Sequence, residues 1–272
     1  MKREIVRGIL LCWLALSLVS GAEDRKSLGR GLAQSPGMHL EYEAPRFLAG
    51  AIYGRGAESN KLLFRFEREA TRSENKLNVR RDYTHPDGRL AARERVVYEG
   101  NEPIAYEMQE LQTGERGTAK ILRDPANPAK GSIKFEYLKE GGSSPKTSTE
   151  VLRGNTLVGD MLGPFLASRW DTLAQGEKIK CRCIVVSRRE TVGFTFVKES
   201  AGTWQGRSVV VLKLEPSSLF VAALVDPLFL TIEAAPPHHV LQYVGRTTPL
   251  TQIGGKWKDL DAVTVFDWKT AR

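Results

Sequence analysis

Residues 62–67 read Leu-Leu-Phe-Arg-Phe-Glu, and this stretch decides the fold class. Side chains of an extended chain alternate between two faces, so Leu62, Phe64 and Phe66 share one face while Arg65 and Glu67 share the other. Related alternation recurs along the chain, over residues 77–83, 90–98, 103–111, 117–123, 133–137, 179–185, 192–196, 204–214, 228–233, 240–245 and 263–266. The sequence therefore predicts a mainly β protein.

Turn signals separate these segments. His85-Pro86-Asp87-Gly88 places a proline and a glycine where a tight turn needs them. Similar breaks occur at residues 112–115 and 235–238. Because short connections favour antiparallel neighbours, we expect about ten to twelve strands in one large antiparallel sheet.

One segment, about residues 155–174, has a helical pattern instead. Its apolar side chains recur at three- and four-residue steps, namely Leu157, Val158, Met161, Leu162, Phe165, Leu166, Trp170 and Leu173. Asn155 or Thr156 is the expected cap, and Pro164 is expected to kink the helix or split it. The predicted fold is α+β, with a curled, half-barrel-like sheet wrapped around this single amphipathic helix.

The N-terminal segment has the pattern of an export signal. Three basic residues within the first seven positions precede an apolar run over 9–19, and small residues follow at 20–22. This predicts a cleaved signal peptide over 1–22 and a soluble periplasmic product, with an uncleaved anchor as the alternative. We expect a flexible lead over 23–37 and a single β-rich domain over 38–272.

Composition narrows the classes further. The chain has 272 residues, 41% of them hydrophobic, and a formal charge of +8. Residues 1–22 hold three basic residues and one acidic residue, so cleavage would leave +6. Nucleic acid is not an expected partner of an exported chain, whereas anionic lipid headgroups or cell-wall polymers suit the charge. In the stretch 65–69, Arg-Phe-Glu-Arg-Glu, interleaved charges are typical of a solvated strand face.

No motif for catalysis, metal or cofactor stands out. The sequence has no HExxH, P-loop, GxSxG or EF-hand pattern, and no cofactor or metal is predicted. Histidines 39, 85, 238 and 239 include a pair in a turn, where opportunistic metal binding is the minor reading. Cys181 and Cys183 are interpreted as small buried apolar residues, with a redox or metal role as the alternative.

Two groups of residues are candidate binding elements. The apolar stretch over 219–230 is interpreted as a core helix followed by a strand, or else as a flap over a hydrophobic cavity. Candidate walls of such a cavity are Phe165, Trp170, Phe194, Phe196 and Phe220. Arg169, Arg188 and Arg189 either form structural ion pairs or act as an anion clamp, because guanidinium groups bind anions through two hydrogen bonds.

Several short runs resemble an uncharacterised family of exported bacterial β-rich proteins. They are Trp170-Asp171, Leu173, Gly176-Glu177, Val186 to Arg188, Glu190 to Phe194, Asp226-Pro227 and Tyr243 to Arg246. The resemblance covers about residues 60–250 and implies no established activity. In general form the chain is similar to the half-barrel of periplasmic lipoprotein carriers, which implies an apolar ligand cupped by a sheet.

The sequence thus favours a non-enzymatic periplasmic protein that binds or carries an apolar or amphiphilic envelope ligand, either lipid or lipoprotein, in a β-sheet cavity. The alternative is a non-catalytic structural or interaction module of the cell envelope, with an envelope protein as its partner. A hydrolase with a site that no motif reveals is the third hypothesis.

Overall fold

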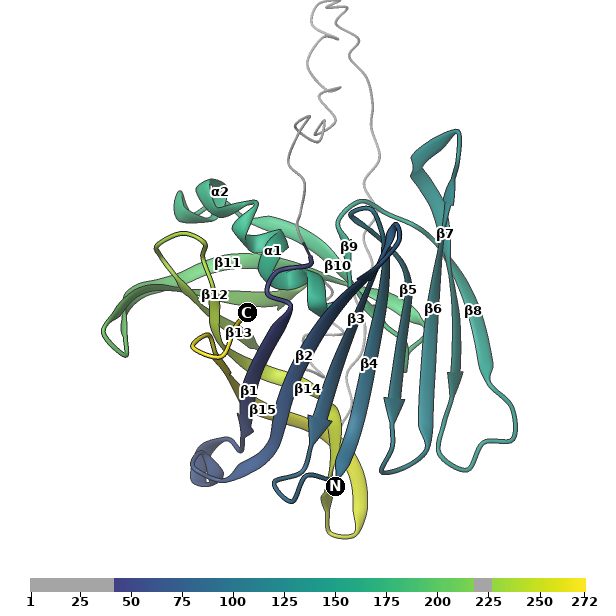
Figure 1. The fold of residues 1–272 in the computed structure, drawn as a ribbon, viewed down its shortest axis with the longest axis horizontal. Coiled ribbons are helices and arrows are strands. Elements are labelled where there is room, and N and C mark those ends of the chain that lie inside the picture. The colour runs from purple at the N-terminus through teal and green to yellow at the C-terminus, as the bar shows by residue number, and fades with distance from the viewer. Residues whose placement is uncertain (1–41, 218–226) are drawn as a thin grey trace, which may run out of the picture. The chain divides into compact units, whose positions relative to one another are not determined.

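A computed structural model describes residues 42–217 and 227–272, which belong to one compact unit. All fifteen strands of this part of the chain join a single curled sheet (Figure 1). The first eight strands are β1 (Phe47–Tyr53), β2 (Leu62–Ser73), β3 (Lys76–Thr84), β4 (Leu90–Glu99), β5 (Glu102–Glu110), β6 (Glu115–Asp124), β7 (Asn127–Leu138) and β8 (Lys146–Val151). The others are β9 (Thr156–Leu157), β10 (Ile179–Val185), β11 (Glu190–Trp204), β12 (Arg207–Pro216), β13 (Leu228–Glu233), β14 (Val240–Ile253) and β15 (Lys256–Asp267).

The sheet is antiparallel except where β9 pairs with β10. The turns expected at 85–88, 112–115 and 235–238 are confirmed, since they join β3 to β4, β5 to β6 and β13 to β14. The first strand pairs with the last, with Ala51 opposite Val265. As a result the middle of the chain, at β8 and β9, forms the two edges of the sheet.

These two edges are joined by a very short connection. Only four residues, 152–155, separate the end of β8 from the start of β9. Such a link spans at most about 17 Å, whereas fifteen strands laid flat would extend about 65 Å. The sheet must therefore curl until its edges approach each other.

Side chains bridge the remaining gap. Glu150 on β8 accepts hydrogen bonds from the backbone N–H of Thr191 at 2.9 Å and from its hydroxyl at 2.8 Å. The hydroxyl of Ser148 donates to the carbonyl of Arg189. Among the described residues β8 pairs by its backbone with β7 alone, so the curled sheet stays unclosed.

The helical segment differs from the expected continuous helix over 155–174. Residues 156–157 form β9, a 3₁₀ turn (η2, Gly159–Met161) follows, and two short helices complete the segment, α1 (Leu162–Ala167) and α2 (Trp170–Ala174). A further 3₁₀ turn, η1, covers Gly56–Glu58. Proline is tolerated in the first turn of a helix, which explains why α1 begins just before Pro164.

The inward faces of the strands form the core. Large side chains on β7, β11 and β12 share one cluster with α1 and α2, including Phe135, Phe196, Leu212, Leu166 and Leu173. A second cluster lies on β1, β2, β3, β4 and β15 and includes Ile52, Phe64, Phe66, Tyr83 and Leu260. Within the described residues no helix is long and apolar enough to cross a membrane.

The bridge between the sheet edges is testable. Glu150→Ala leaves the N–H and hydroxyl of Thr191 without their acceptor, so it should lower the free energy of unfolding by about 1–3 kcal/mol. Glu136→Ala, on the exposed face of β7, is the control and should change it by less than about 0.5 kcal/mol. Urea unfolding followed by tryptophan fluorescence measures both, and equal effects would contradict the bridge.

Candidate functional site

One inward position on each of three neighbouring strands carries a charge. Arg68 on β2 lies opposite Arg81 on β3, and Arg81 lies opposite Glu94 on β4. Along β2, the inward neighbours of Arg68 are Phe66 and Ala70, which belong to different apolar clusters. We call Arg68, Arg81, Glu94 and Asp160 the charged layer, because these groups separate the two clusters.

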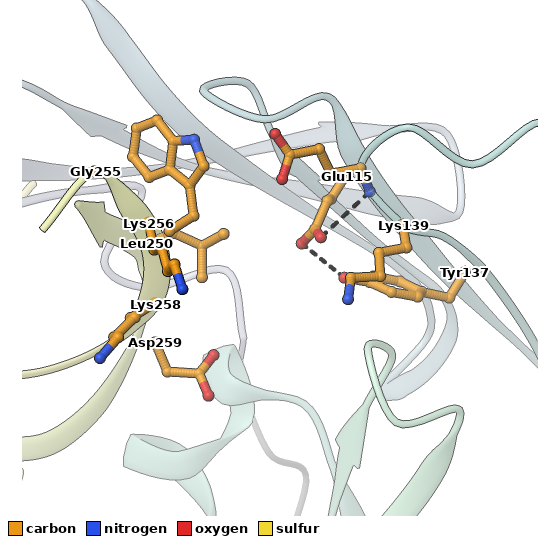
Figure 2. A pocket seen from close by; sticks show the side chains of 10 residues that line it. Glu115, Tyr137, Lys139, Leu250, Gly255, Lys256, Lys258 and Asp259 are labelled. Atoms are coloured by element: carbon orange, nitrogen blue, oxygen red, sulfur yellow. Dashed lines mark hydrogen bonds between the residues drawn. The ribbon is translucent and has the colours of Figure 1, made fainter. Parts of the chain in front are cut away.

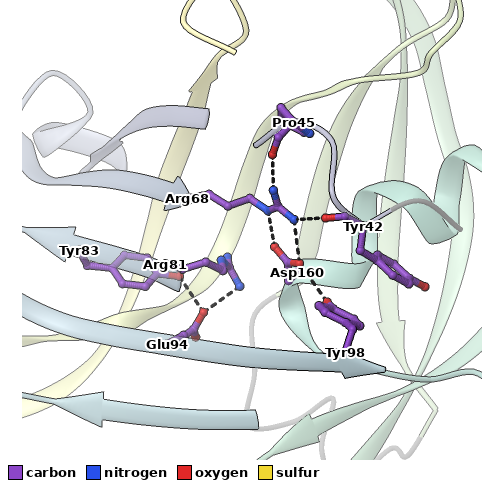
Figure 3. Close-up of polar contacts among 8 residues, drawn as sticks. All are labelled: Tyr42, Pro45, Arg68, Arg81, Tyr83, Glu94, Tyr98 and Asp160. Carbon is purple, nitrogen blue, oxygen red and sulfur yellow. Dashed lines mark hydrogen bonds and ion pairs between the residues drawn. The ribbon is translucent and has the colours of Figure 1, made fainter. Parts of the chain in front are cut away.

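The fourth member comes from η2. Arg68 Nε donates to Asp160 Oδ1 at 2.6 Å, and its Nη2 donates to Oδ2 at 3.2 Å (Figure 3). The two side chains are only 8% and 2% exposed. Tyr98 donates its hydroxyl to the same carboxylate at 2.9 Å. Like charges on opposed strand positions repel, so Asp160 neutralises an arginine that the sheet places beside another.

Arg68 also positions the start of the described chain. Its two Nη groups donate to the carbonyl oxygens of Pro45 and, at 2.5 Å, of Tyr42. The Tyr42 ring stacks on Tyr98 with centroids 4.7 Å apart. The buried Tyr42 hydroxyl has no hydrogen-bond partner within residues 42–217 and 227–272.

Glu94 collects the second set of contacts. Arg81 Nη1 lies 2.8 Å from its carboxylate, and the hydroxyls of Tyr83 and Tyr106 donate to it at 3.2 and 2.9 Å. Thr248 on β14 also donates to it, although β14 lies five places away in the sheet. The charged layer thus ties opposite walls of the curl together.

A glycine permits the close approach of η2 to this layer. A Cβ atom at Gly159 would lie 2.7 Å from Arg81 Nη1. The Arg81 guanidinium also lies over the Phe66 ring, 5.3 Å from its centroid. Any larger residue at 159 would displace the guanidinium from between the turn and the ring.

Burial and charge oppose each other in the pKa values of the layer. Burial raises the pKa of Asp160, but the charges of Arg68 and Arg81 and the hydrogen bonds from Arg68 and Tyr98 together outweigh burial and hold the pKa below its ordinary value. Burial has the largest single effect on Arg81 and lowers its pKa, but Glu94 together with Tyr83, Asp160 and Tyr106 outweighs burial, so the pKa is raised. Asp160 and Arg81 are therefore both charged at neutral pH.

A third buried carboxylate, Glu110, joins β14 to the turn after β5. Glu110 accepts hydrogen bonds from the backbone N–H of Leu250 and from the side chain of Gln112, both at 2.9 Å. The same Gln112 side chain donates to the carbonyl of Leu250 at 3.1 Å. Burial raises the pKa of Glu110. These bonds hold the β5–β6 and β14–β15 hairpins side by side.

An open pocket of about 840 Å³ lies next to this contact, between β6–β7 and the β14–β15 hairpin (Figure 2). It is lined by Glu115, Tyr137, Lys139, Glu140, Leu250, Gly255, Lys256, Trp257, Lys258 and Asp259. The Tyr137 hydroxyl donates to Glu115 at 2.7 Å, and Asp259 pairs with Arg246 at 2.6 Å. The lining thus combines aromatic and aliphatic surface with both signs of charge.

The predicted cavity-wall residues lie elsewhere. Phe165, Phe194 and Phe196 are buried in the larger apolar cluster, with the rings of Phe165 and Phe196 6.1 Å apart. Trp170 packs at the edge of this cluster and stacks on His238, with centroids 4.0 Å apart. Phe220 lies outside the described residues. None of the other four side chains lines the pocket in Figure 2, and the role of all five residues as cavity walls stays a prediction.

The three arginines of the predicted anion clamp have separate neighbours. Arg169 lies over the Phe165 ring at 5.9 Å. Arg188 pairs with Glu190 at 2.5 Å, as the structural ion-pair reading expects. Arg189 uses its backbone carbonyl to bind Ser148. An anion-binding role for these arginines stays a prediction.

Sequence reasoning missed the charged layer. The interpretation of residues 65–69 as a solvated strand face is wrong for Arg68, which shares the inward face with Phe64 and Phe66. The same alternation puts Arg81 between Val79 and Tyr83. An arginine that alternates together with core residues could have indicated a buried charge. Its partner could not be identified from the local sequence, because Asp160 lies 92 positions away.

The remaining chemistry-bearing residues have local partners. His239 stacks on Trp268 at 3.7 Å and its Nδ1 lies 3.2 Å from Glu233. Hydrogen bonding to Cys183 and burial raise the pKa of the Cys181 thiol. In the part of the chain that the structure describes, no three His, Cys, Asp or Glu side chains are grouped to hold a metal ion.

Comparison with known proteins assigns no function to these residues. No protein-family model matches the chain, and no curated protein sequence matches it. Among solved structures it is similar to a β-barrel-like protein of domain of unknown function DUF1849 from Brucella abortus. The two share 10% sequence identity over 81% of this chain and 96% of that one, with a TM-score of 0.36.

The Arg68–Asp160 pair should carry a large part of the stability. Asp160→Asn leaves a buried guanidinium without its counter-charge, so it should cost about 3–5 kcal/mol of unfolding free energy. Glu58→Gln, in an exposed pair with Lys61, should cost less than about 1 kcal/mol. Adding Arg68→Met to Asp160→Asn should recover part of the loss in urea unfolding. A cost for Asp160→Asn no larger than that of the exposed control would refute the assignment.

The same carboxylate predicts a pH dependence. Because folding lowers its pKa, Asp160 stabilises the protein fully above the unfolded pKa of about 3.9. This stabilisation is lost as pH falls from about 4 through the lowered folded value. The difference in unfolding free energy between wild type and Asp160→Asn should therefore shrink on acidification, as urea titrations at a series of pH values would show. If the difference in unfolding free energy grew below pH 4 instead, the predicted pH dependence would be wrong.

Proposed function

We propose that this chain is an exported, non-catalytic binding protein. Its ligand is an amphiphile that has a polar headgroup and a single acyl chain, or a lipid whose headgroup is accessible. The observation that carries the proposal is the open pocket beside the β14–β15 hairpin. Its volume of about 840 Å³ falls within the range usual for small-ligand sites. The export pattern over residues 1–22 supports a periplasmic location for this activity.

The lining suits an amphiphile because it offers two kinds of surface. Leu250, Trp257 and the ring of Tyr137 supply apolar and aromatic contact. Amphipathic aromatic residues are favoured where one end of a ligand is apolar and the other is hydrated. The pocket is lined by residues other than the aromatic residues that the sequence analysis names as walls of an interior cavity.

The charges of the lining favour a zwitterionic headgroup. Lys139, Lys256 and Lys258 can bind a phosphate, while Glu115 and Glu140 can accept from an ammonium group. Asp259 is already paired with Arg246. A phosphoethanolamine headgroup presents both complementary charges, so lysophosphatidylethanolamine is the probe of choice.

Trp257 provides a direct readout. Titration with lysophosphatidylethanolamine below its micelle concentration should give a saturable change in tryptophan fluorescence that Trp257→Phe removes. Trp204→Phe, at the distant end of β11, is the matched control and should keep the change. An uncharged detergent of equal chain length should bind at least tenfold more weakly.

Two results would overturn the proposal. One is the absence of a saturable signal in both wild type and Trp204→Phe. The other is a signal that Trp257→Phe retains unchanged, since the ligand would then lie away from the pocket. Native mass spectrometry of protein exported by a bacterial host should in addition show a co-purified amphiphile.

A further inference from the structure

We propose that the two hairpin tips beside the pocket dock on an anionic lipid bilayer, which makes the membrane the source of the ligand. The tips are Leu111, in the turn after β5, and Ile253, at the end of β14. They are 47% and 56% exposed, although both are large apolar residues. The inference extends the proposed function and is tested separately from it.

Hydrogen bonds fix the two tips next to each other. Glu110 and Gln112, which flank Leu111, both bond to the backbone of Leu250, three residues before Ile253. The β14–β15 turn projects at the lower end of the sheet in Figure 1. Its glycines, Gly254 and Gly255, both have positive φ, as a tight two-residue hairpin turn requires. The apolar tips thus form one rigid, protruding pair.

The residues behind the tip have the chemistry of a membrane interface. Residues 252–258 read Gln-Ile-Gly-Gly-Lys-Trp-Lys and contain no acidic side chain. Lys256 and Lys258 are exposed and have no ion-pair partner among the residues that the structure describes. Tryptophan is enriched at the headgroup level of bilayers, and each lysine near an anionic surface strengthens binding about fivefold. This charge complementarity singles out an anionic bilayer as the partner.

The other exposed large apolar residues of the described chain differ in setting. Leu122 on β6 and Val151 on β8 both pair across the sheet with Ser132 on β7. They therefore lie within one row of strand positions, near the C-terminal ends of β6 and β8, and on no hairpin tip. With exposures of 46% and 70%, they provide a matched control for apolar surface alone.

Vesicle flotation tests the inference with protein exported by a bacterial host. Wild type should float with vesicles of phosphatidylglycerol and phosphatidylethanolamine and bind phosphatidylcholine vesicles at least tenfold more weakly. The double variant Leu111→Ser, Ile253→Ser should lose at least tenfold in binding, while Leu122→Ser, Val151→Ser should stay within twofold of wild type. All variants have the same sequence before residue 42, so that segment contributes equally to each.

Salt dependence gives an independent readout of the lysines. Raising the salt concentration from about 0.05 M to about 0.5 M shortens the screening length from about 14 Å to about 4 Å and should weaken wild-type binding at least fivefold. The inference fails if wild type does not bind the anionic vesicles, or if the tip variant and the control variant lose binding equally. It also fails if binding is indifferent to lipid charge.

The two proposals can fail independently. Leu111 and Ile253 do not line the pocket, so the tip variant should keep the lysophosphatidylethanolamine titration of wild type. A tip variant that binds vesicles normally sinks the docking inference alone. A wild type that floats with vesicles but never responds to the lysolipid sinks the proposed function alone.

Discussion

The structure depends on a single covalent constraint, the four-residue connection between β8 and β9. Because β1 and β15 pair in the middle of the sheet, the chain places its two edges at consecutive strands. A short connection between edges cannot be made in a flat sheet, so curling follows from connectivity before any side chain is considered. Glu150 and Ser148, on the edge strand β8, then bond to Thr191 on β11 and to Arg189 in the turn before it, without closing the backbone ladder.

The same connection explains the charged layer. Beyond β9 the chain turns inward through η2, and Asp160 reaches Arg68 at 2.6 Å. Burying two arginines in one row of the sheet costs desolvation and repulsion, which only buried carboxylates can offset. Asp160 comes from the crossover and Glu94 from the sheet. The interior is therefore neutral only when the crossover is in place, which links the position of α1 and α2 to the electrostatics of the sheet.

The sequence predicts those parts of the fold in which apolar and polar residues alternate clearly, and misses the parts in which they do not. Strong alternation located the strands, and proline and glycine located the turns between them. β8, Lys-Thr-Ser-Thr-Glu-Val, has one apolar residue, and β9 has only two residues, so neither carries a periodic signal. The helical pattern over 155–174 correctly indicated helix in part of this segment. The parallel pairing of β9 with β10 and the fixed φ of Pro164 divide the segment into shorter elements. The pocket is lined by both Tyr137 and Trp257. These residues lie 120 positions apart, and no local sequence pattern shows that they share a site.

The distance between the two sheet edges tests the central claim most directly. Spin labels at Thr147→Cys and Arg188→Cys, with Cys12, Cys181 and Cys183 replaced by serine, would report it by pulsed electron resonance. The curled sheet predicts a narrow distribution at about 20 Å or less, since Ser148 contacts Arg189. A distribution centred beyond about 40 Å, toward the roughly 65 Å width of a flat sheet, would contradict the account.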